Sequence, residues 1–96
     1  MLVLVTYDVD TTSKEGERRL RKVAKECVNY GQRVQNSVFE CLLTEAQFVI
    51  LRNTLKCLID GKTDSIRFYF LGKNWQRRVE YIGKKTSFDM TDELII

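Results

Sequence analysis

The chain has 96 residues, of which 30% are charged and 44% hydrophobic, and its formal net charge is +3. This length fits one domain, and so small a domain buries only about 60–65% of its unfolded surface, so a second copy would stabilise it. No apolar run approaches the roughly 20 residues that span a bilayer, and no secretory signal opens the chain. We therefore expect a cytoplasmic protein that does not contact membranes.

Histidine is absent, and the three cysteines, Cys27, Cys41 and Cys57, have no CxxC spacing. We interpret these cysteines as reduced, buried thiols. The absence of histidine excludes Ser-His-Asp and Cys-His nucleophiles and disfavours a zinc site. Any metal is then expected to be a hard cation held by oxygen ligands.

The first stretch, residues 2–10, is an apolar run that ends in acidic residues, which predicts a buried strand. Alternation places Tyr7 on one face and Asp8 at the end of the other, and both faces begin apolar, as in a central strand. A carboxylate is rarely buried without a partner. We expect Asp8 either to bind a cation, or to cap a loop or helix, or to pair with Arg33. Asp10 is a weaker ligand candidate.

A helix is predicted to start at the capping box of Thr12 and Glu15 and to end at Gly31. Its apolar face follows helical spacing and comprises Leu20, Val23, Ala24, Cys27 and Val28. The opposite face carries four basic residues at the same spacing, which we call the basic stripe: Arg18, Arg21, Lys22 and Lys25. The stripe is either an ordinary solvated helix face or a surface for nucleic-acid phosphates.

The middle of the chain predicts a hairpin over residues 32–43 with Asn36 and Ser37 in the turn, although one long strand is an alternative. Thr44 and Gln47 form a second capping box. The helix that follows has its apolar face at Phe48, Leu51, Leu55, Leu58 and Ile59 and ends at Gly61. Residues 64–71 alternate as a clear strand, and residues 76–82 predict a weaker one.

The resulting order, β-α-β-β-α-β, is typical of an α+β ferredoxin-like sandwich, here with an additional C-terminal strand. We expect a single domain over residues 1–96, with a core at 1–82 and a tail at 83–96 that packs on a partner subunit. Leu2, Leu4 and Thr6 would lie on the open sheet face. Such an apolar face is an expected homodimer interface, and a two-fold axis there brings two copies of Asp8 together.

Three segments together resemble the Cas2 family of small CRISPR-associated proteins: LVTYDV at 4–9, GQRVQNSVFE at 31–40 and DSIRFYFLG at 64–72. The resemblance covers about residues 1–82. It implies a homodimer that binds duplex DNA, joins the CRISPR integrase subunit in spacer acquisition, and has Mg²⁺- or Mn²⁺-dependent endonuclease activity on single-stranded RNA or double-stranded DNA. The alternatives are a non-enzymatic architectural dimer that bridges integrase subunits and a toxin ribonuclease of the VapD type.

The resemblance also implies roles for individual residues. Asp8 matches the family's metal-binding, catalytic aspartate, and Tyr7, Ser37 and Phe39 match supporting positions. Arg33 matches a position that binds nucleic acid, but it could equally be a surface arginine of an edge strand. Phe39 could stack on a base or serve as a core aromatic. A second basic cluster comprises Arg77, Arg78, Lys84 and Lys85.

Overall fold

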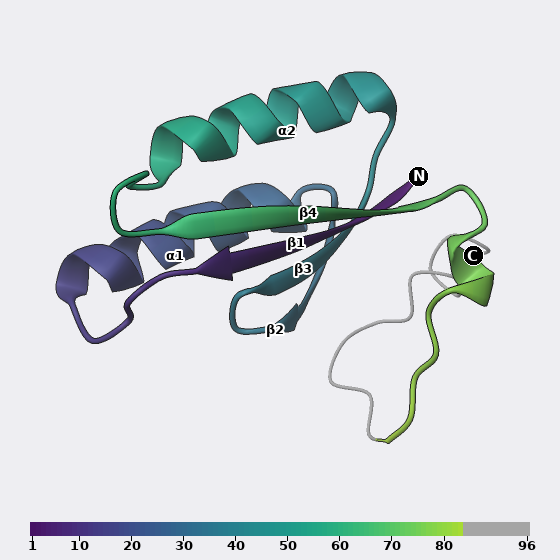
Figure 1. Ribbon diagram of the computed structural model, residues 1–96, viewed down its shortest axis with the longest axis horizontal. Coiled ribbons are helices and arrows are strands. Elements are labelled where there is room, and N and C mark those ends of the chain that lie inside the picture. Colours follow the sequence, from purple (N-terminus) through teal and green to yellow (C-terminus); the bar gives the residue numbers. More distant parts are fainter. Residues whose placement is uncertain (84–96) are drawn as a thin grey trace.

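The computed structural model describes residues 1–83, which form a four-stranded sheet with two helices. The elements in chain order are β1 (Leu2–Asp8), α1 (Lys14–Val28), β2 (Gly31–Gln35), β3 (Val38–Leu42), α2 (Glu45–Leu58), β4 (Ser65–Gly72) and the 3-10 turn η1 (Trp75–Arg77). The strand order is β2-β3-β1-β4, and every neighbouring pair is antiparallel. The predicted α+β arrangement with β1 as a central strand is confirmed (Figure 1).

One face of the sheet and both helices enclose the core. Val3, Val5 and Tyr7 of β1 are 2% exposed or less and pack in one cluster with buried residues of β3, α1 and α2. On the helices this cluster contains Val23, Ala24, Cys27, Leu51 and Leu55. The alternate residues of β1 therefore lie on the sheet face away from the helices, and we call this surface the open face.

The start of α1 differs from the prediction by one residue. Ser13, not Thr12, is the N-cap, and its side chain accepts a hydrogen bond from the Gly16 amide. Thr12 instead donates both its amide and its hydroxyl to Asp10 Oδ1, at 2.9 and 2.6 Å. Because both hydrogen-bond donors of Thr12 are used in this local turn, the N-cap moves one residue along the chain to Ser13.

The predicted hairpin and the second capping box are confirmed. β2 and β3 flank a turn at Asn36 and Ser37, and the side chains and amides of Thr44 and Gln47 cap α2 reciprocally. Neither Gly31 nor Gly61 ends its helix in a left-handed conformation, because Gly72 and Gly83 are the only residues with positive φ between residues 1 and 83.

The additional strand predicted over residues 76–82 is wrong. The chain leaves β4 at Gly72, whose φ of 76° is left-handed, and turns through η1. A strand needs a neighbour for its backbone hydrogen bonds, and residues 78–83 pair with none in the described part of the chain. Residues 84–96, to which most of the predicted tail belongs, lie outside the described residues.

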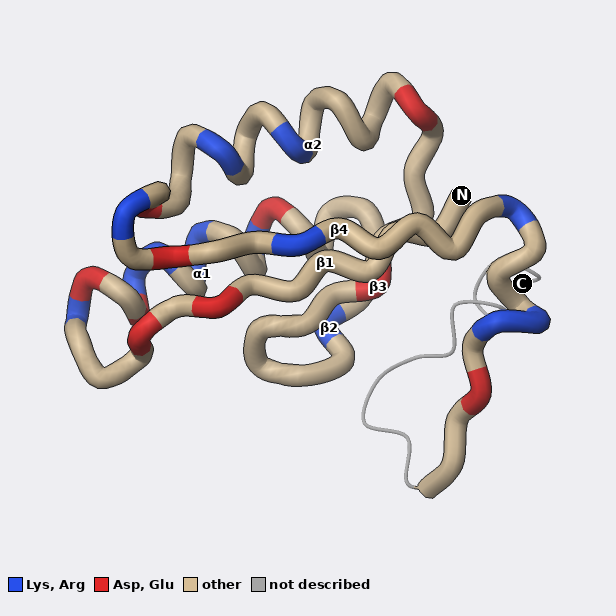
Figure 2. Tube along the Cα trace, viewed as in Figure 1, with Lys and Arg blue, Asp and Glu red and all other residues tan. Residues whose placement is uncertain are grey.

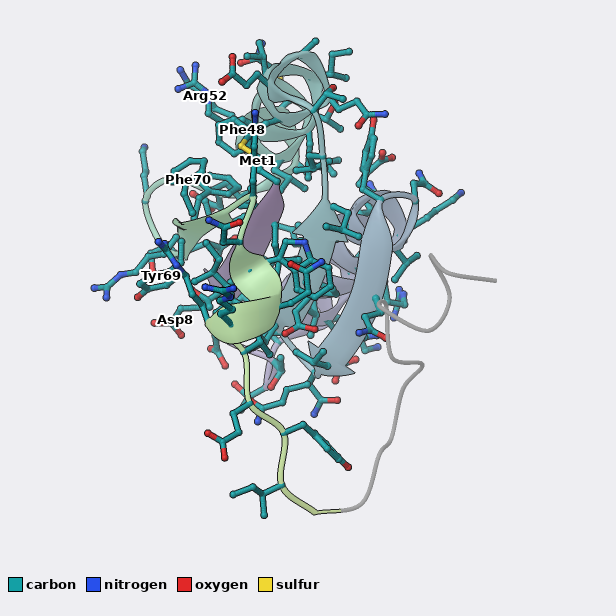
Figure 3. The ribbon with its side chains drawn as sticks, turned by 90° about the vertical axis from the view of Figure 1, so that its right-hand side faces the viewer. Met1, Asp8, Phe48, Arg52, Tyr69 and Phe70 are labelled. Atoms are coloured by element: carbon teal, nitrogen blue, oxygen red, sulfur yellow. The ribbon has the colours of Figure 1, made fainter. Side chains whose placement is uncertain are left out.

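Three predicted burial states are also wrong. Leu2 is 1% exposed although it lies on the open face. It pairs with Gly72 at the end of the sheet where Figure 3 shows η1. Val28 is exposed at the last residue of α1. Cys57 is exposed because it follows the buried Leu55 by two residues, which turns it away from the inward face of α2. Cys27 and Cys41 are buried as predicted, and all three thiols are free.

Candidate functional site

Asp8 is the last residue of β1 and is exposed on the open face. It pairs across the ladder with Ser65, the first residue of β4. Within residues 1–83 its carboxylate forms no hydrogen bond or ion pair, so neither a cap nor a basic side chain neutralises it. Figure 3 shows Asp8 and Tyr69 projecting from the strands on the side away from Phe48 and α2. The carboxylate is therefore free to bind a cation.

A buried polar cluster lies directly behind Asp8, on the helix side of the sheet. Its centre is Asp64, whose side chain is fully buried. Arg19 donates from Nε to Asp64 Oδ2 at 2.8 Å and from Nη2 to Oδ1 at 3.2 Å, and the Tyr7 hydroxyl also donates to Oδ2. The Asp60 amide and the Thr63 hydroxyl complete the set at 3.0 and 3.2 Å. We call these residues the Asp64 cluster.

The Asp64 cluster lowers the pKa of Asp64 and raises the pKa values of Tyr7 and Arg19. Burial acts to raise the pKa of Asp64, but hydrogen bonds from Arg19, then Tyr7, then the Asp60 amide outweigh it and hold this pKa at about 2. Burial, followed by the hydrogen bond to Asp64, raises the pKa of Tyr7 to about 12. At neutral pH the cluster therefore contains an ionised carboxylate, a neutral phenol and a guanidinium cation.

Arg33 is not a partner of Asp8. It pairs with Phe39, which in turn pairs with Val5, so Arg33 belongs to the helix side of the sheet. Its Nε donates to the Asn36 carbonyl at 2.8 Å, and its guanidinium carbon lies 5.7 Å from the centre of the Phe39 ring. Because the side chain is exposed at the sheet edge, it remains available to a phosphate, but on the other side of the sheet from Asp8.

The supporting residues have structural positions. Phe39 is 0% exposed in the core, which favours its interpretation as a core aromatic over a base-stacking one. Ser37 lies in the hairpin turn, where its carbonyl accepts from the Tyr7 amide at 2.9 Å. Tyr7 itself is buried and belongs to the Asp64 cluster. Asp10 is already bonded to Thr12, and these hydrogen bonds lower its pKa.

All four residues of the basic stripe are exposed on α1. Because the opposite face of α1 packs into the core, the stripe points away from the sheet, on the other side of the molecule from the open face. Figure 2 shows Lys and Arg segments along α1. A straight duplex lying on the stripe would therefore not contact Asp8 of the same subunit. Arg77 and Arg78 are exposed as well, whereas Lys84 and Lys85 lie outside the described residues.

Several residues beside Asp8 were not identified from the sequence. Arg67 and Tyr69 share its face, and Arg19 and Asp64 support it from behind. Arg19 precedes Val23 by four residues, so helical spacing alone places it on the apolar side of α1. Asp64 likewise shares strand parity with the inward-facing Ile66. A charged residue at a position that faces the core needs a partner, so the sequence could have predicted that Arg19 and Asp64 pair with each other.

The residues that could hold a metal are few. No group of three or more acidic or thiol side chains converges within residues 1–83. Asp8 is the exposed, unpaired carboxylate on the open face, and one or two carboxylates can hold Mg²⁺ when water or phosphate oxygens complete its shell. The donor chemistry therefore fits a hard cation that is shared with substrate or with a second subunit, but not a complete site within one chain.

No helix in the described range is long and apolar enough to cross a membrane.

The chain is similar to known proteins over nearly its whole length. The sequence model of the family described as "CRISPR associated protein Cas2" matches residues 1–79. The chain is 58% identical to "CRISPR-associated endonuclease Cas2" of Halalkalibacterium halodurans, over 99% of each chain, and 59% identical to "CRISPR-associated endoribonuclease Cas2" of Chlorobaculum tepidum, over 100% of each. The crystal structure of Streptococcus pyogenes Cas2 at pH 6.5 superposes with a TM-score of 0.80 at 67% identity, covering 86% of this chain and 100% of that one.

Proposed function

Because the chain belongs to the Cas2 family of CRISPR-associated proteins, we propose that it is an endonuclease that hydrolyses phosphodiester bonds at Asp8. The substrate is single-stranded RNA or double-stranded DNA. The observation that carries the proposal is the unpaired, exposed carboxylate of Asp8 at the end of β1, whose other residues are buried or partly buried. Exposing a charge is ordinary, but fixing it on the central strand of a sheet gives it a defined position for a ligand.

We propose Mg²⁺ or Mn²⁺ as the cofactor, held by Asp8. Such an ion supplies a more acidic water and stabilisation of phosphate charge when it is bound. The protein's own part is to fix the carboxylate: Tyr7 and Asp64 immediately precede Asp8 and Ser65, so the Asp64 cluster anchors both strands one residue behind the site.

We further propose that the protein is a homodimer formed through the open face. Leu4 and Thr6 are partly exposed there, and the exposed Tyr69 lies beside Leu4 across the ladder. A two-fold axis over β1 would bring two copies of Asp8 toward one another, which would supply the second carboxylate that one chain lacks. In this dimer the two basic stripes remain outside, free to bind DNA.

The decisive experiment compares the wild-type protein with Asp8→Asn, using labelled single-stranded RNA and duplex DNA with Mn²⁺. Because Asp8 is exposed and unpaired, the variant should keep its free energy of unfolding within about 0.5 kcal/mol of wild type in urea denaturation. Its cleavage rate should fall below detection. An Asp8→Asn protein that cuts either substrate at the wild-type rate would exclude this site. A preference for RNA without any association with an integrase would favour a VapD-type toxin ribonuclease.

A second candidate is a non-enzymatic architectural subunit that bridges integrase subunits on duplex DNA. It is favoured by one observation, that the basic stripe and Asp8 lie on opposite sides of the sheet. In this role the stripe binds DNA and Asp8 is not used. Spacer integration measured with the integrase present separates the candidates: Asp8→Asn should retain integration in the architectural role even when it no longer cleaves.

A further inference from the structure

Arg67 lies on the same open face as Asp8. In the β1–β4 ladder Asp8 pairs with Ser65 and Thr6 pairs with Arg67, so Arg67 is the diagonal neighbour of Asp8. Diagonal neighbours on one face are about 7–8 Å apart at the backbone, within reach of a long side chain. Figure 2 shows the Lys/Arg segment of β4 close to the acidic end of β1. A guanidinium and a carboxylate therefore share one small exposed surface.

The two charges do not neutralise each other. Within residues 1–83 the one ion pair joins Arg19 and Asp64, and both Asp8 and Arg67 are exposed. Arg67 Nη1 instead donates to the Tyr69 hydroxyl at 3.5 Å. That hydroxyl first, and the Asp8 carboxylate after it, raise the pKa of Arg67 and keep it charged. Both groups thus remain available to a ligand that carries both signs of charge, such as a phosphate with its cation.

Arg67 is also the one basic strand residue that lies on the same face as Asp8 within residues 1–83. The four strands contain two basic residues, Arg33 and Arg67. Arg33 belongs to the helix side of the sheet, where it lies over Phe39. Within the described range, Arg67 is therefore the only cation that the sheet presents beside Asp8.

Building on the proposed nuclease function, we propose that Arg67 is a catalytic residue that binds a non-bridging oxygen of the scissile phosphate beside Asp8. In the hydrolysis, a water oxygen bonds to phosphorus and the bond from phosphorus to one bridging oxygen breaks. The water gives up one proton to solvent, and the leaving oxygen takes up one. Arg67 neither gains nor loses a proton, because its planar donors act only on the charge of the phosphate oxygens. Such stabilisation acts most strongly in the transition state.

The test compares four variants in the full-length chain: Asp8→Asn, Arg67→Gln, Arg67→Lys and, as a matched control, Lys56→Gln on the exposed side of α2. Cleavage of labelled RNA and DNA gives kcat and KM, electron paramagnetic resonance measures Mn²⁺ binding, and light scattering measures the oligomeric state. Arg67→Gln should lower kcat about 100-fold with little change in KM. Arg67→Lys should lose about tenfold, because it keeps the charge but not the fork of donors. Lys56→Gln should match wild type.

Mn²⁺ binding separates a catalytic role from a structural one. Removing a cation next to Asp8 should leave Mn²⁺ binding as tight as in wild type or tighter, whereas Asp8→Asn should abolish it. If Arg67→Gln retains wild-type kcat while Asp8→Asn is inactive, the role of Arg67 is wrong and the nuclease site stands. If Arg67→Gln loses activity together with Mn²⁺ binding or with its oligomeric state, its role is structural. If Asp8→Asn cuts normally, the proposed nuclease site itself is wrong.

Discussion

Tyr7 donates its hydroxyl hydrogen to the buried carboxylate of Asp64, 57 residues further along the chain. Each residue immediately precedes one member of the Asp8–Ser65 pair, so the hydrogen bond joins β1 and β4 one residue behind the candidate site. Arg19 adds α1 to the same junction through two hydrogen bonds to Asp64. The position of Asp8 is thus set by three elements, although within residues 1–83 its own side chain forms no hydrogen bond or ion pair with them.

The first prediction concerns the stability provided by Asp64. Replacing Asp64 by Asn removes the negative charge of the carboxylate that accepts hydrogen bonds from Arg19 and Tyr7. We expect the free energy of unfolding to fall by about 2 kcal/mol. Urea denaturation measures the difference. Glu80→Gln, an exposed position, is the control and should change stability by less than about 0.5 kcal/mol. Equal midpoints for Asp64→Asn and wild type would show that the cluster is not stabilising.

The second prediction concerns acid. The pKa of Asp64 is about 2 in the folded protein, below the roughly 3.9 of an unfolded aspartate. Folding therefore favours the ionised form, so this contribution is fully present above about pH 4 and is lost as the pH falls from about 4 toward 2. Urea midpoints of wild type and Asp64→Asn should differ at pH 6 and converge near pH 2. A constant difference across this range would contradict the assigned hydrogen bonds.

The third prediction concerns the basic stripe. Replacing Arg18, Arg21 and Lys22 by Gln should weaken duplex binding and reduce the slope of log K against log salt by about 0.9 for each phosphate that the variant no longer neutralises. Fluorescence anisotropy at several salt concentrations measures both. Arg52→Gln, Lys56→Gln and Lys62→Gln together remove the same number of exposed positive charges from α2 and the turn after it and should leave the slope near the wild-type value. If both sets of substitutions reduce the slope equally, binding follows net charge and the stripe is not a specific surface.

The fourth prediction distinguishes the two roles considered for Phe39. Since its ring is 0% exposed, Phe39→Leu should cost about 1–2 kcal/mol of stability and leave nucleic-acid affinity unchanged at temperatures where the protein is folded. Urea denaturation and anisotropy measure the two effects separately. A tenfold weaker affinity with unchanged stability would instead show that the ring contacts a base.

The sequence predicted the parts of the site that follow from local periodicity. Alternation along residues 2–10 was enough to place Tyr7 on one face and Asp8 at the end of the other, and turn-forming residues placed the hairpin. The neighbours of Asp8 depend instead on register between strands that are far apart in sequence. Arg33 and Arg67 are equally plausible partners until the ladder shows which one shares the face of Asp8. Register is decided by packing across the whole sheet, so no single segment encodes it.

The same distinction explains the incorrect helix start and the missing fifth strand. Thr12 and Ser13 are both good N-cap residues. Because the Thr12 hydroxyl donates to Asp10, Ser13 is the residue that caps α1. Residues 76–82 alternate weakly, but alternation alone does not supply a neighbouring strand for their backbone groups. In the first case a side chain two residues away selected the cap, and in the second residues 1–83 offer no strand that pairs with the segment.

The last prediction concerns Gly16, which lies in the first turn of α1. A Cβ there would stand 1.8 Å from the Asp10 carbonyl oxygen, a backbone atom of the turn that follows Asp8 and Val9. Alanine is intrinsically better than glycine in a helix by about 1 kcal/mol. We nevertheless expect Gly16→Ala to be destabilising by about 1–3 kcal/mol, because the turn or the helix must move apart.

Gly61→Ala is the matched control, because a Cβ at Gly61 meets no atom within 4 Å and its backbone has no positive φ. This variant should be neutral or slightly stabilising, since alanine restricts the unfolded chain. Urea denaturation of both variants measures the contrast. Displacing the Asp10 turn also moves the chain that leaves Asp8, so Gly16→Ala should lower the cleavage rate at temperatures where it remains folded, and Gly61→Ala should not. Equal stability and equal activity of the two variants would show that the turn tolerates the extra carbon and does not position Asp8.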